Sequence, residues 1–172
     1  MLTVTTAATV EPVTLAEAKA HLRVTHAMDD TLIGALISAA RERVELNTGR
    51  ALAAATYLWA ADCNWQTLPL FPVATITDAT YLNGDEARVD LPAYTLDTER
   101  NRITLDDDVT LDGDRVNITF TTAPTVIPAA LKAAILLIVG DLYTNTEEHG
   151  EALSVNPAVD CLVYPFRVNL GV

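Results

Sequence analysis

Residues that usually carry enzyme chemistry are scarce in this chain. Its 172 residues include two cysteines, three histidines and seven glycines, and serine occurs only at Ser38 and Ser154. Neither serine lies in a GxSxG motif, and no GxxxxGK phosphate loop is present. Cys63 and Cys161 form neither a CxxC pair nor a zinc-ligand spacing, so we expect free, buried thiols in a reducing compartment. The sequence thus suggests no catalytic or cofactor-binding residues, and we expect no enzyme and no cofactor.

Metal ligands are equally sparse. His21 and His26 are five residues apart, which is not the spacing of two ligands on one helix face, and His149 stands alone. The stretch DDDVTLDGD at residues 106–114 resembles the first half of a calcium loop. However, Thr119 occupies the position at which such a loop has a bidentate glutamate. We therefore favour an acidic hairpin turn and expect no metal site.

Positive charge is also in short supply. The chain has 11 Lys and Arg against 23 Asp and Glu, which gives a formal net charge of -12. A protein that binds nucleic acid through its phosphates normally has a basic face, so this composition argues against that class. Arg41, Arg43 and Arg50 could form a small basic patch at the end of a helix. A solvated face is the simpler interpretation, but these arginines could also meet acidic neighbours across a subunit boundary.

No apolar run is long enough for a membrane span. The most apolar stretch, VIPAALKAAILLIVG at residues 126–140, contains Pro128 and Lys132 and falls short of the roughly 20 apolar residues required. The N-terminus lacks the basic start and long apolar run of a signal peptide. We expect a core helix here and no membrane partner.

Helix signals are clear in the first third of the chain. Thr14 and Glu17 fit a capping box, and an apolar stripe follows them. A second helix, capped by Asp29 or Asp30, is predicted up to Gly49, a natural left-handed stop. Residues 14–50 are therefore predicted to form a helical hairpin.

The apolar period changes from 3.6 to 2 further along the chain. Tyr57, Trp59 and Trp65 alternate on one predicted strand face, and residues 115–122 alternate equally well. We predict about four to six antiparallel strands over residues 56–122. A buried core helix is then predicted at 128–145, followed by a mobile polar loop. A short helix from Pro157, ended by Pro165, and an extended tail are predicted over 157–172.

These patterns together predict an α+β fold. We expect one domain over residues 1–172, a small helical bundle in which the N-terminal hairpin packs with the buried C-terminal helix. The antiparallel β region is inserted into this bundle.

Several segments resemble a known family. EPVTLAEAKAHLRV and DDTLIGALISAARERVELNTGRAL are similar to the start of phage head-tail connector proteins of the gp6-like, phiE125 gp8-like type. LPLFPV, YTLDTERNRITL, RVNITF, VIPAALKAAILLIVGDLYTN and LVYPFRV follow in the family's order. The resemblance covers about residues 11–168. The segment FTTAP departs from the glycine-rich turn that relatives often carry.

The resemblance implies a structural role in a virion or gene transfer agent particle. Family members form a ring of twelve copies beneath the portal, extend the DNA channel and dock stopper or tail-terminator proteins. For this chain it implies synthesis in the bacterial cytoplasm, a place in the particle neck and passage of DNA without specific binding. Tyr164, Phe166 and Arg167 are residue types enriched at binding hot spots, so we expect them to contact the portal or a neighbouring subunit.

Two alternatives remain open from the sequence. One is another head-completion or stopper protein of the same kind of particle. The other is a small calcium- or carbohydrate-binding module, for which the aromatic face of Tyr57, Trp59 and Trp65 is the motivation, although alternating aromatics more often belong to a core.

Overall fold

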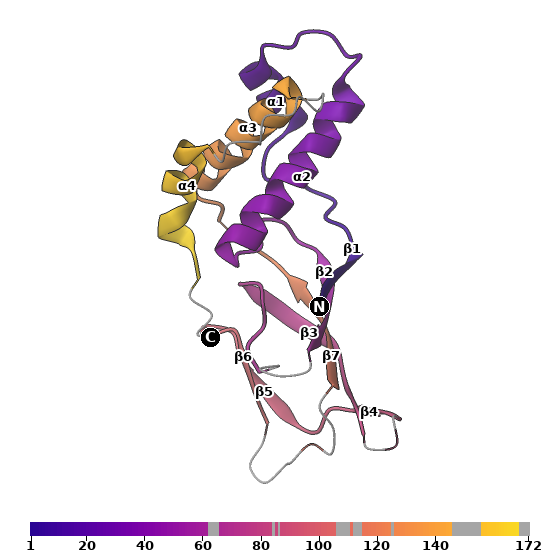
Figure 1. Cartoon of the computed structure of the whole chain (residues 1–172). Helices are drawn as coiled ribbons and strands as arrows, with labels where there is room; N and C mark the ends of the chain where they lie inside the picture. Colours follow the sequence, from indigo (N-terminus) through magenta and orange to yellow (C-terminus); the bar gives the residue numbers. More distant parts are fainter. Residues whose placement is uncertain are drawn as a thin grey trace. The chain divides into compact units, whose positions relative to one another are not determined.

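The chain divides into two compact units, each with its own core. The computed structural model describes residues 1–61, 66–83, 85, 87–105, 111, 115–124, 126–145 and 156–168. A β unit contains Met1–Thr9 and Ala53–Pro124, and a helical unit contains Val10–Leu52 and Thr125–Val168. Figure 1 shows the elements of both units coloured along the sequence. The α+β class predicted from the sequence is confirmed, whereas a single domain with a β insertion stays a prediction.

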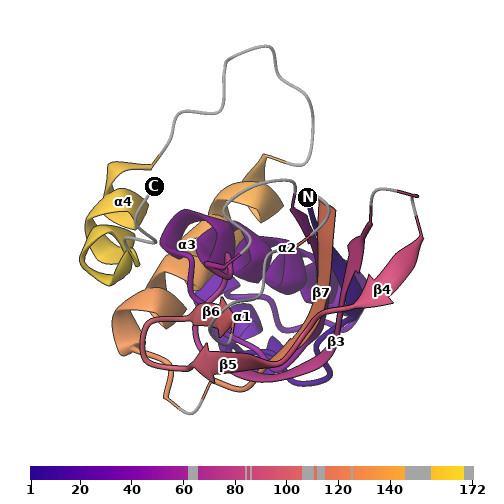
Figure 2. The same ribbon diagram turned by 90° about the horizontal axis from the view of Figure 1, so that it is seen from below.

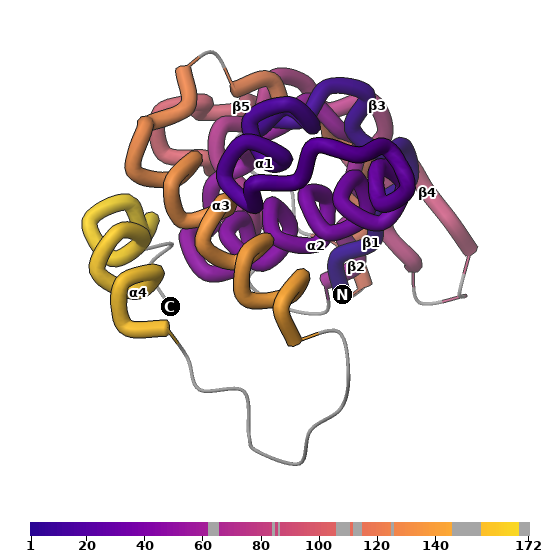
Figure 3. Tube along the Cα trace, turned by 90° about the horizontal axis from the view of Figure 1, so that it is seen from above, coloured from indigo at the N-terminus to yellow at the C-terminus, as the bar shows by residue number. Residues whose placement is uncertain are grey.

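The helical unit is organised around its third helix. Its elements are α1 (Leu15–Leu22), α2 (Asp30–Thr48), α3 (Ala129–Thr144), α4 (Pro157–Val163) and a 3₁₀ turn, η1 (Tyr164–Phe166). Helix α3 contacts α1, α2 and α4. Seen from above in Figure 3, it runs between α2 and α4.

Helix α1 begins at the predicted capping box. The Glu17 N–H donates to the Thr14 hydroxyl at 3.2 Å, and the Thr14 N–H donates to the Glu17 carboxylate at 2.7 Å. The backbone bond from Thr14, followed by its side-chain bond, lowers the pKa of Glu17 below the ordinary 4.5. Because the pKa of Glu17 is lower in the folded protein, the capping box stabilises the fold at pH values above the ordinary pKa of a glutamate. This stabilisation is lost as the pH falls through the pKa that Glu17 has in the folded protein.

Helix α2 begins and ends where predicted, but its N-cap lacks the predicted side-chain hydrogen bond. Gly49 has a φ of 66°, the left-handed conformation that closes a helix without steric cost. Asp29 occupies the N-cap position but makes no side-chain cap. Its carboxylate instead accepts a hydrogen bond from the Tyr143 hydroxyl on α3 at 2.5 Å, which raises the pKa of Tyr143. The residue expected to cap α2 therefore joins α2 to α3.

Helix α3 supplies the largest share of the helical core. The residues on its inner face are buried: Leu131, Ala134, Ile135, Ile138 and Val139. Fully burying one leucine, isoleucine or valine side chain contributes about 1.5–3 kcal/mol relative to exposure. Pro128 lies at the N-cap, one residue before the helical position predicted for it. Among the described residues, no helix is both long and apolar enough to cross a bilayer.

A buried ion-pair network links α2 to the segments that precede α1 and follow α2. The Arg41 side chain is only 5% exposed. Its Nε donates to the Glu11 carboxylate at 2.8 Å and its Nη1 to the Glu45 carboxylate at 2.5 Å. Glu45 also accepts from the backbone N–H of Leu52 at 2.7 Å. The network therefore holds the segment that leads into α1 and the segment that follows α2.

The β unit is built on a five-stranded antiparallel sheet. Its strand order is β1 (Leu2–Thr6), β2 (Thr56–Ala61), β7 (Arg115–Thr122), β3 (Val73–Leu82) and β4 (Arg88–Asp90). Figure 2 shows β7 and β3 running side by side with β4 outermost. The edge strand β1, which the sequence analysis did not predict, pairs with β2 from Leu2 opposite Trp59.

Strand β7 forms the centre of the sheet and of its core. Val116, Ile118 and Phe120 are fully buried, which confirms the alternation predicted for this strand. Tyr57 on β2 stacks on Phe120, with ring centroids 5.6 Å apart. The sheet therefore packs on one face, and the Tyr57 ring belongs to its core.

The second sheet of this unit is the hairpin β5 (Tyr94–Asp97) and β6 (Arg102–Leu105). Asn101 precedes β6 with a φ of 55° and is 1% exposed. Its amide Nδ2 donates to the carbonyls of Leu68 and Leu70 at 2.7 and 2.8 Å. One asparagine thus provides a left-handed turn residue and a buried link to the neighbouring segment.

Two predictions near the C-terminus need correction, and others lie outside the described residues. The helical chain does not end at Pro165, because η1 continues through it to Phe166; proline is tolerated in the first turn, where its missing N–H is not needed. Cys161 is exposed rather than buried, since the inner side of α4 is taken by Val159 and Val163. The predictions for Cys63, Trp65, residues 106–110 and 112–114, and the loop 146–155 with His149 fall outside the described residues.

We predict that Arg41→Met destabilises the protein by about 3–5 kcal/mol, because it leaves the buried Glu45 carboxylate without its cation. Urea unfolding followed by circular dichroism measures the change. The matched control is Arg43→Met, an exposed arginine two positions along the same helix, for which we expect a change within about 0.5 kcal/mol. Equal effects of the two variants would show that the buried network does not stabilise the fold.

We predict that Asn101→Ala lowers the free energy of unfolding by about 2–4 kcal/mol, since it loses two buried hydrogen bonds and strains a left-handed residue. Asn101→Gly keeps the conformation and should lose only about 1–3 kcal/mol. Both values come from the same denaturant titration. If the alanine variant were the more stable of the two, the assigned backbone role of Asn101 would be wrong.

Candidate functional site

The C-terminal segment that the sequence singles out is anchored on the end of α2. The Val168 N–H donates to the Thr48 carbonyl at 2.7 Å, and Arg50 Nε donates to the Phe166 carbonyl at 2.9 Å. The Phe166 side chain is half-buried against the helical core. Phe166 is therefore first of all an anchor that fixes the direction of the segment.

The neighbouring side chains of this segment face solvent. Tyr164 is 71% exposed, and the Arg167 guanidinium carbon lies 5.7 Å from the centroid of its ring. Arg167 also lies 3.9 Å from the Asp160 carboxylate. Exposed pairs of this kind contribute at most about 1 kcal/mol to the free energy of unfolding. Tyr164 and Arg167 can therefore change conformation at low cost when a partner binds. An anchored segment with an exposed aromatic and arginine has the composition of a protein-binding surface.

The three arginines do not form the basic patch considered from the sequence. Arg41 is buried in its ion pairs, and Arg50 is half-buried and bonded to Phe166. Arg43 alone of the three is exposed. An inter-subunit role for these arginines stays a prediction, with Arg43 the residue best exposed for one.

Sequence reasoning missed a second set of surface residues on α2. Leu32 and Leu46 are exposed although both are large and apolar, and Ala35 and Ala39 lie between them on the same side. The 3.6-residue apolar period of this helix predicts that Leu32 is buried together with Ile33 and Ile37, but Leu32 is 43% exposed. The spacing of these four residues was the available signal, because it defines an apolar stripe separate from the one centred on Ile33 and Ile37.

The other candidate residues are not brought together. His26 lies 3.9 Å from the Asp29 carboxylate, and His21 is exposed on α1. Among the described residues there is no group of three or more histidine, cysteine or acidic side chains that could hold a metal ion. Tyr57 is buried and Trp59 half-buried, so this part of the aromatic face is not arranged as an open sugar platform.

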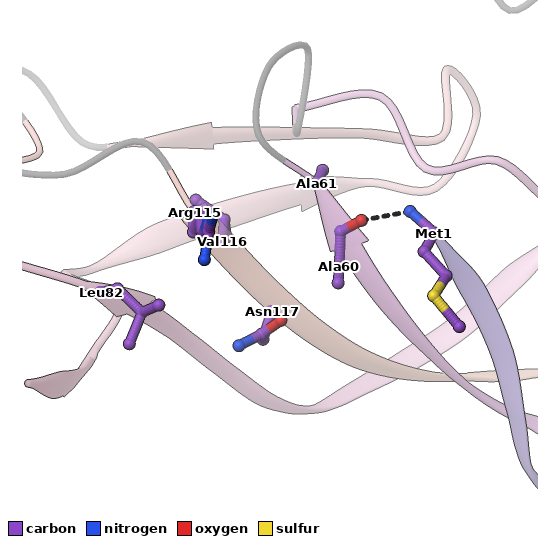
Figure 4. Close-up of a pocket in the computed structure, with 7 residues that line it drawn as sticks. All are labelled: Met1, Ala60, Ala61, Leu82, Arg115, Val116 and Asn117. Atoms are coloured by element: carbon purple, nitrogen blue, oxygen red, sulfur yellow. Dashed lines mark hydrogen bonds between the residues drawn. The ribbon is translucent and has the colours of Figure 1, made fainter. Parts of the chain in front are cut away.

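A shallow pocket of about 360 Å³ lies on the sheet of the β unit (Figure 4). Its lining residues are Met1, Ala60, Ala61, Leu82, Arg115, Val116 and Asn117. The N-terminal amine of Met1 donates to the Ala60 carbonyl across one side of it. The lining contains no carboxylate, histidine or cysteine side chain, and its N-terminal amine is hydrogen-bonded to the Ala60 carbonyl.

Comparison with known proteins identifies a structural relationship. Residues 12–83 match the family of phage gp6-like head-tail connector proteins. No curated protein matches the chain.

Three solved structures share the fold over nearly the whole chain. One is a protein in the neck of a native gene transfer agent (GTA) particle, a neck structure computed with C12 symmetry. Its sequence is 27% identical to this chain, and the two folds superimpose with a TM-score of 0.69 over 97% of this chain and 94% of that one. Two further matches are 24% identical and cover 97% of this chain and 95% of each match. They come from the neck of an empty GTA particle computed with C6 symmetry (TM-score 0.71) and from a native GTA virion (TM-score 0.72). The chain is therefore similar to phage gp6-like head-tail connector proteins over residues 12–83, and it shares the fold of proteins from the necks of GTA particles over nearly its whole length.

Proposed function

We propose that this protein is the head-tail adaptor subunit of a phage-like particle and that its copies form a ring in the particle neck. The observation that carries the proposal is the fold shared over 97% of the chain with a neck protein of C12 symmetry, together with the connector signature in residues 12–83. A neck with rotational symmetry supports a ring-like oligomer. The role is structural, and no catalytic step is part of it.

Twelve copies beneath a portal are the assembly that fits best. The C12 symmetry of the similar neck supports this number. Such a ring extends the DNA channel, and its lower side would receive a stopper or tail-terminator protein. With -12 formal charges per copy, the ring carries strong negative charge and repels DNA phosphates. DNA would therefore pass through without specific binding.

The exposed part of the C-terminal segment is the proposed site of attachment. Tyr164 and Arg167 present an aromatic ring and a guanidinium outside the core, while Phe166 holds the segment in place. We assign this surface to the portal or to a neighbouring copy. Synthesis in the bacterial cytoplasm followed by incorporation into the particle is consistent with this role.

We predict that the protein forms a ring near twelve subunits, alone or on its cognate portal. Twelve times 18.5 kDa is about 220 kDa. Multi-angle light scattering with and without portal measures the mass. A monomer of 18.5 kDa under both conditions would contradict the adaptor function.

We also predict that the double variant Tyr164→Ala, Arg167→Ala lowers the fraction of protein in rings or on the portal at least tenfold, while its melting temperature changes little because both side chains are exposed. Sedimentation of protein–portal mixtures gives the bound fraction. Val126→Ala, also at an exposed residue of the helical unit, is the control and should assemble normally. Normal assembly of the double variant would remove these residues from the interface.

A further inference from the structure

Helix α2 is apolar on two sides. Leu32, Ala35, Ala39 and Leu46 stand at i, i+3, i+7 and i+14, so they share one face, and Leu46 is 73% exposed. The opposite face is buried in the helical core through Ile33, Ile37, Ala40 and Val44. A helix that is apolar on both sides is expected to be covered on both, and within the described part of the chain only one side is covered. The exposed row is called the α2 stripe below.

A second exposed surface of the helical unit is formed by α4 and η1. Helix α4 buries Val159 and Val163, while Cys161 of α4 and Tyr164 and Pro165 of η1 are exposed. These three residues form the outer α4 face. Figures 1 and 3 show α2 and α4 each packed along α3, and α4 also contacts α2. Because each helix buries the side that packs toward the core, the α2 stripe and the outer α4 face point in different directions.

A closed ring of identical copies needs two such surfaces. Head-to-tail contacts join different patches of neighbouring subunits, so each subunit must present one patch on either side. We infer that the α2 stripe of one copy docks on the outer α4 face of the next copy. This inference rests on the ring proposed above and names the surfaces that close it. It also assigns Tyr164 to the neighbouring copy rather than to the portal.

Charge complementarity supports a second copy as the occupant. Copies with a net charge of -12 repel one another, so their contact must be apolar or of opposite charge. Arg43 is exposed beside the α2 stripe, between Ala39 and Leu46 in sequence, and Asp160 is exposed beside Cys161 on α4. Docking would bring Arg43 of one copy to Asp160 of the next copy. That Asp160 would then have two cationic neighbours, because Arg167 of the same copy lies 3.9 Å from it. This pairing fixes the register of the apolar contact.

The exposed Cys161 makes the contact directly testable. The variant Ala39→Cys places a thiol on the α2 stripe, and a short bismaleimide can join it to Cys161 of the next copy. We expect a ladder of cross-linked species on a denaturing gel, from dimers up to the closed ring. Adding Cys161→Ser to the Ala39→Cys variant should abolish the ladder. The reaction is run with and without the cognate portal.

Charge reversal gives an independent readout. Arg43→Asp should shift at least nine-tenths of the protein from the ring to the monomer in light scattering, because it meets Asp160 of the next copy. The double variant Arg43→Asp, Asp160→Arg should recover the ring, whereas Val126→Glu, elsewhere on the unit, should leave assembly unchanged. Circular dichroism confirms that each variant is folded.

The outcomes separate this inference from the proposed function. If wild-type protein stays monomeric with and without portal, both are overturned. If wild type forms rings but Ala39→Cys gives no ladder, or gives only dimers that persist after Cys161→Ser, the assigned surfaces are wrong while the adaptor role stands. A ladder that depends on Cys161, together with rescue by the charge swap, supports the α2–α4 contact.

Discussion

The helical unit depends on the buried guanidinium of Arg41. Burying a charge is costly unless its hydrogen bonds are satisfied, and here two carboxylates receive them. Glu11 and Leu52 lie beside the two points at which the N-terminal part of the chain passes between the units. The network therefore ties both crossings to one helix. An apolar residue in place of Arg41 could fill the space but could not hold these two segments in position.

The ion-pair network also bears on the candidate interaction surfaces, because α2 carries both the network and one of these surfaces. The α2 helix carries the ion-pair network on its inner side, and its C-terminal end receives Val168 and Phe166. The orientation of Tyr164 thus follows from the position of α2. A ring multiplies any error in subunit geometry around its circumference, so an interface on well-packed helices closes more reliably than one on loops.

Local signals in the sequence predicted the elements, and tertiary packing decided what they missed. The capping box at Thr14, the stop at Gly49 and the alternation around Ile118 are determined by neighbours in sequence, and each was predicted correctly. Burial of Arg41 required knowing where Glu11 would lie, and exposure of Cys161 required knowing which side of α4 faces α3. Strand β1 was missed because its pairing with β2 joins residues fifty or more positions apart. The candidate interaction surfaces could not be predicted from the sequence, because they consist of apolar residues that stay exposed after the core has packed.

The edge strand β1 has a consequence for how the protein behaves at high concentration. Its sequence LTVTT contains no charge and no proline, Val4 is exposed, and among the described residues no further strand pairs with its outer edge. Electrostatic repulsion between the negatively charged copies then opposes pairing of one edge strand with another. That repulsion vanishes near the isoelectric point of about 4.4 and is screened by salt. Acidic or high-salt storage therefore favours edge-to-edge aggregation, and the protein's colloidal stability is set by its charge rather than by its fold.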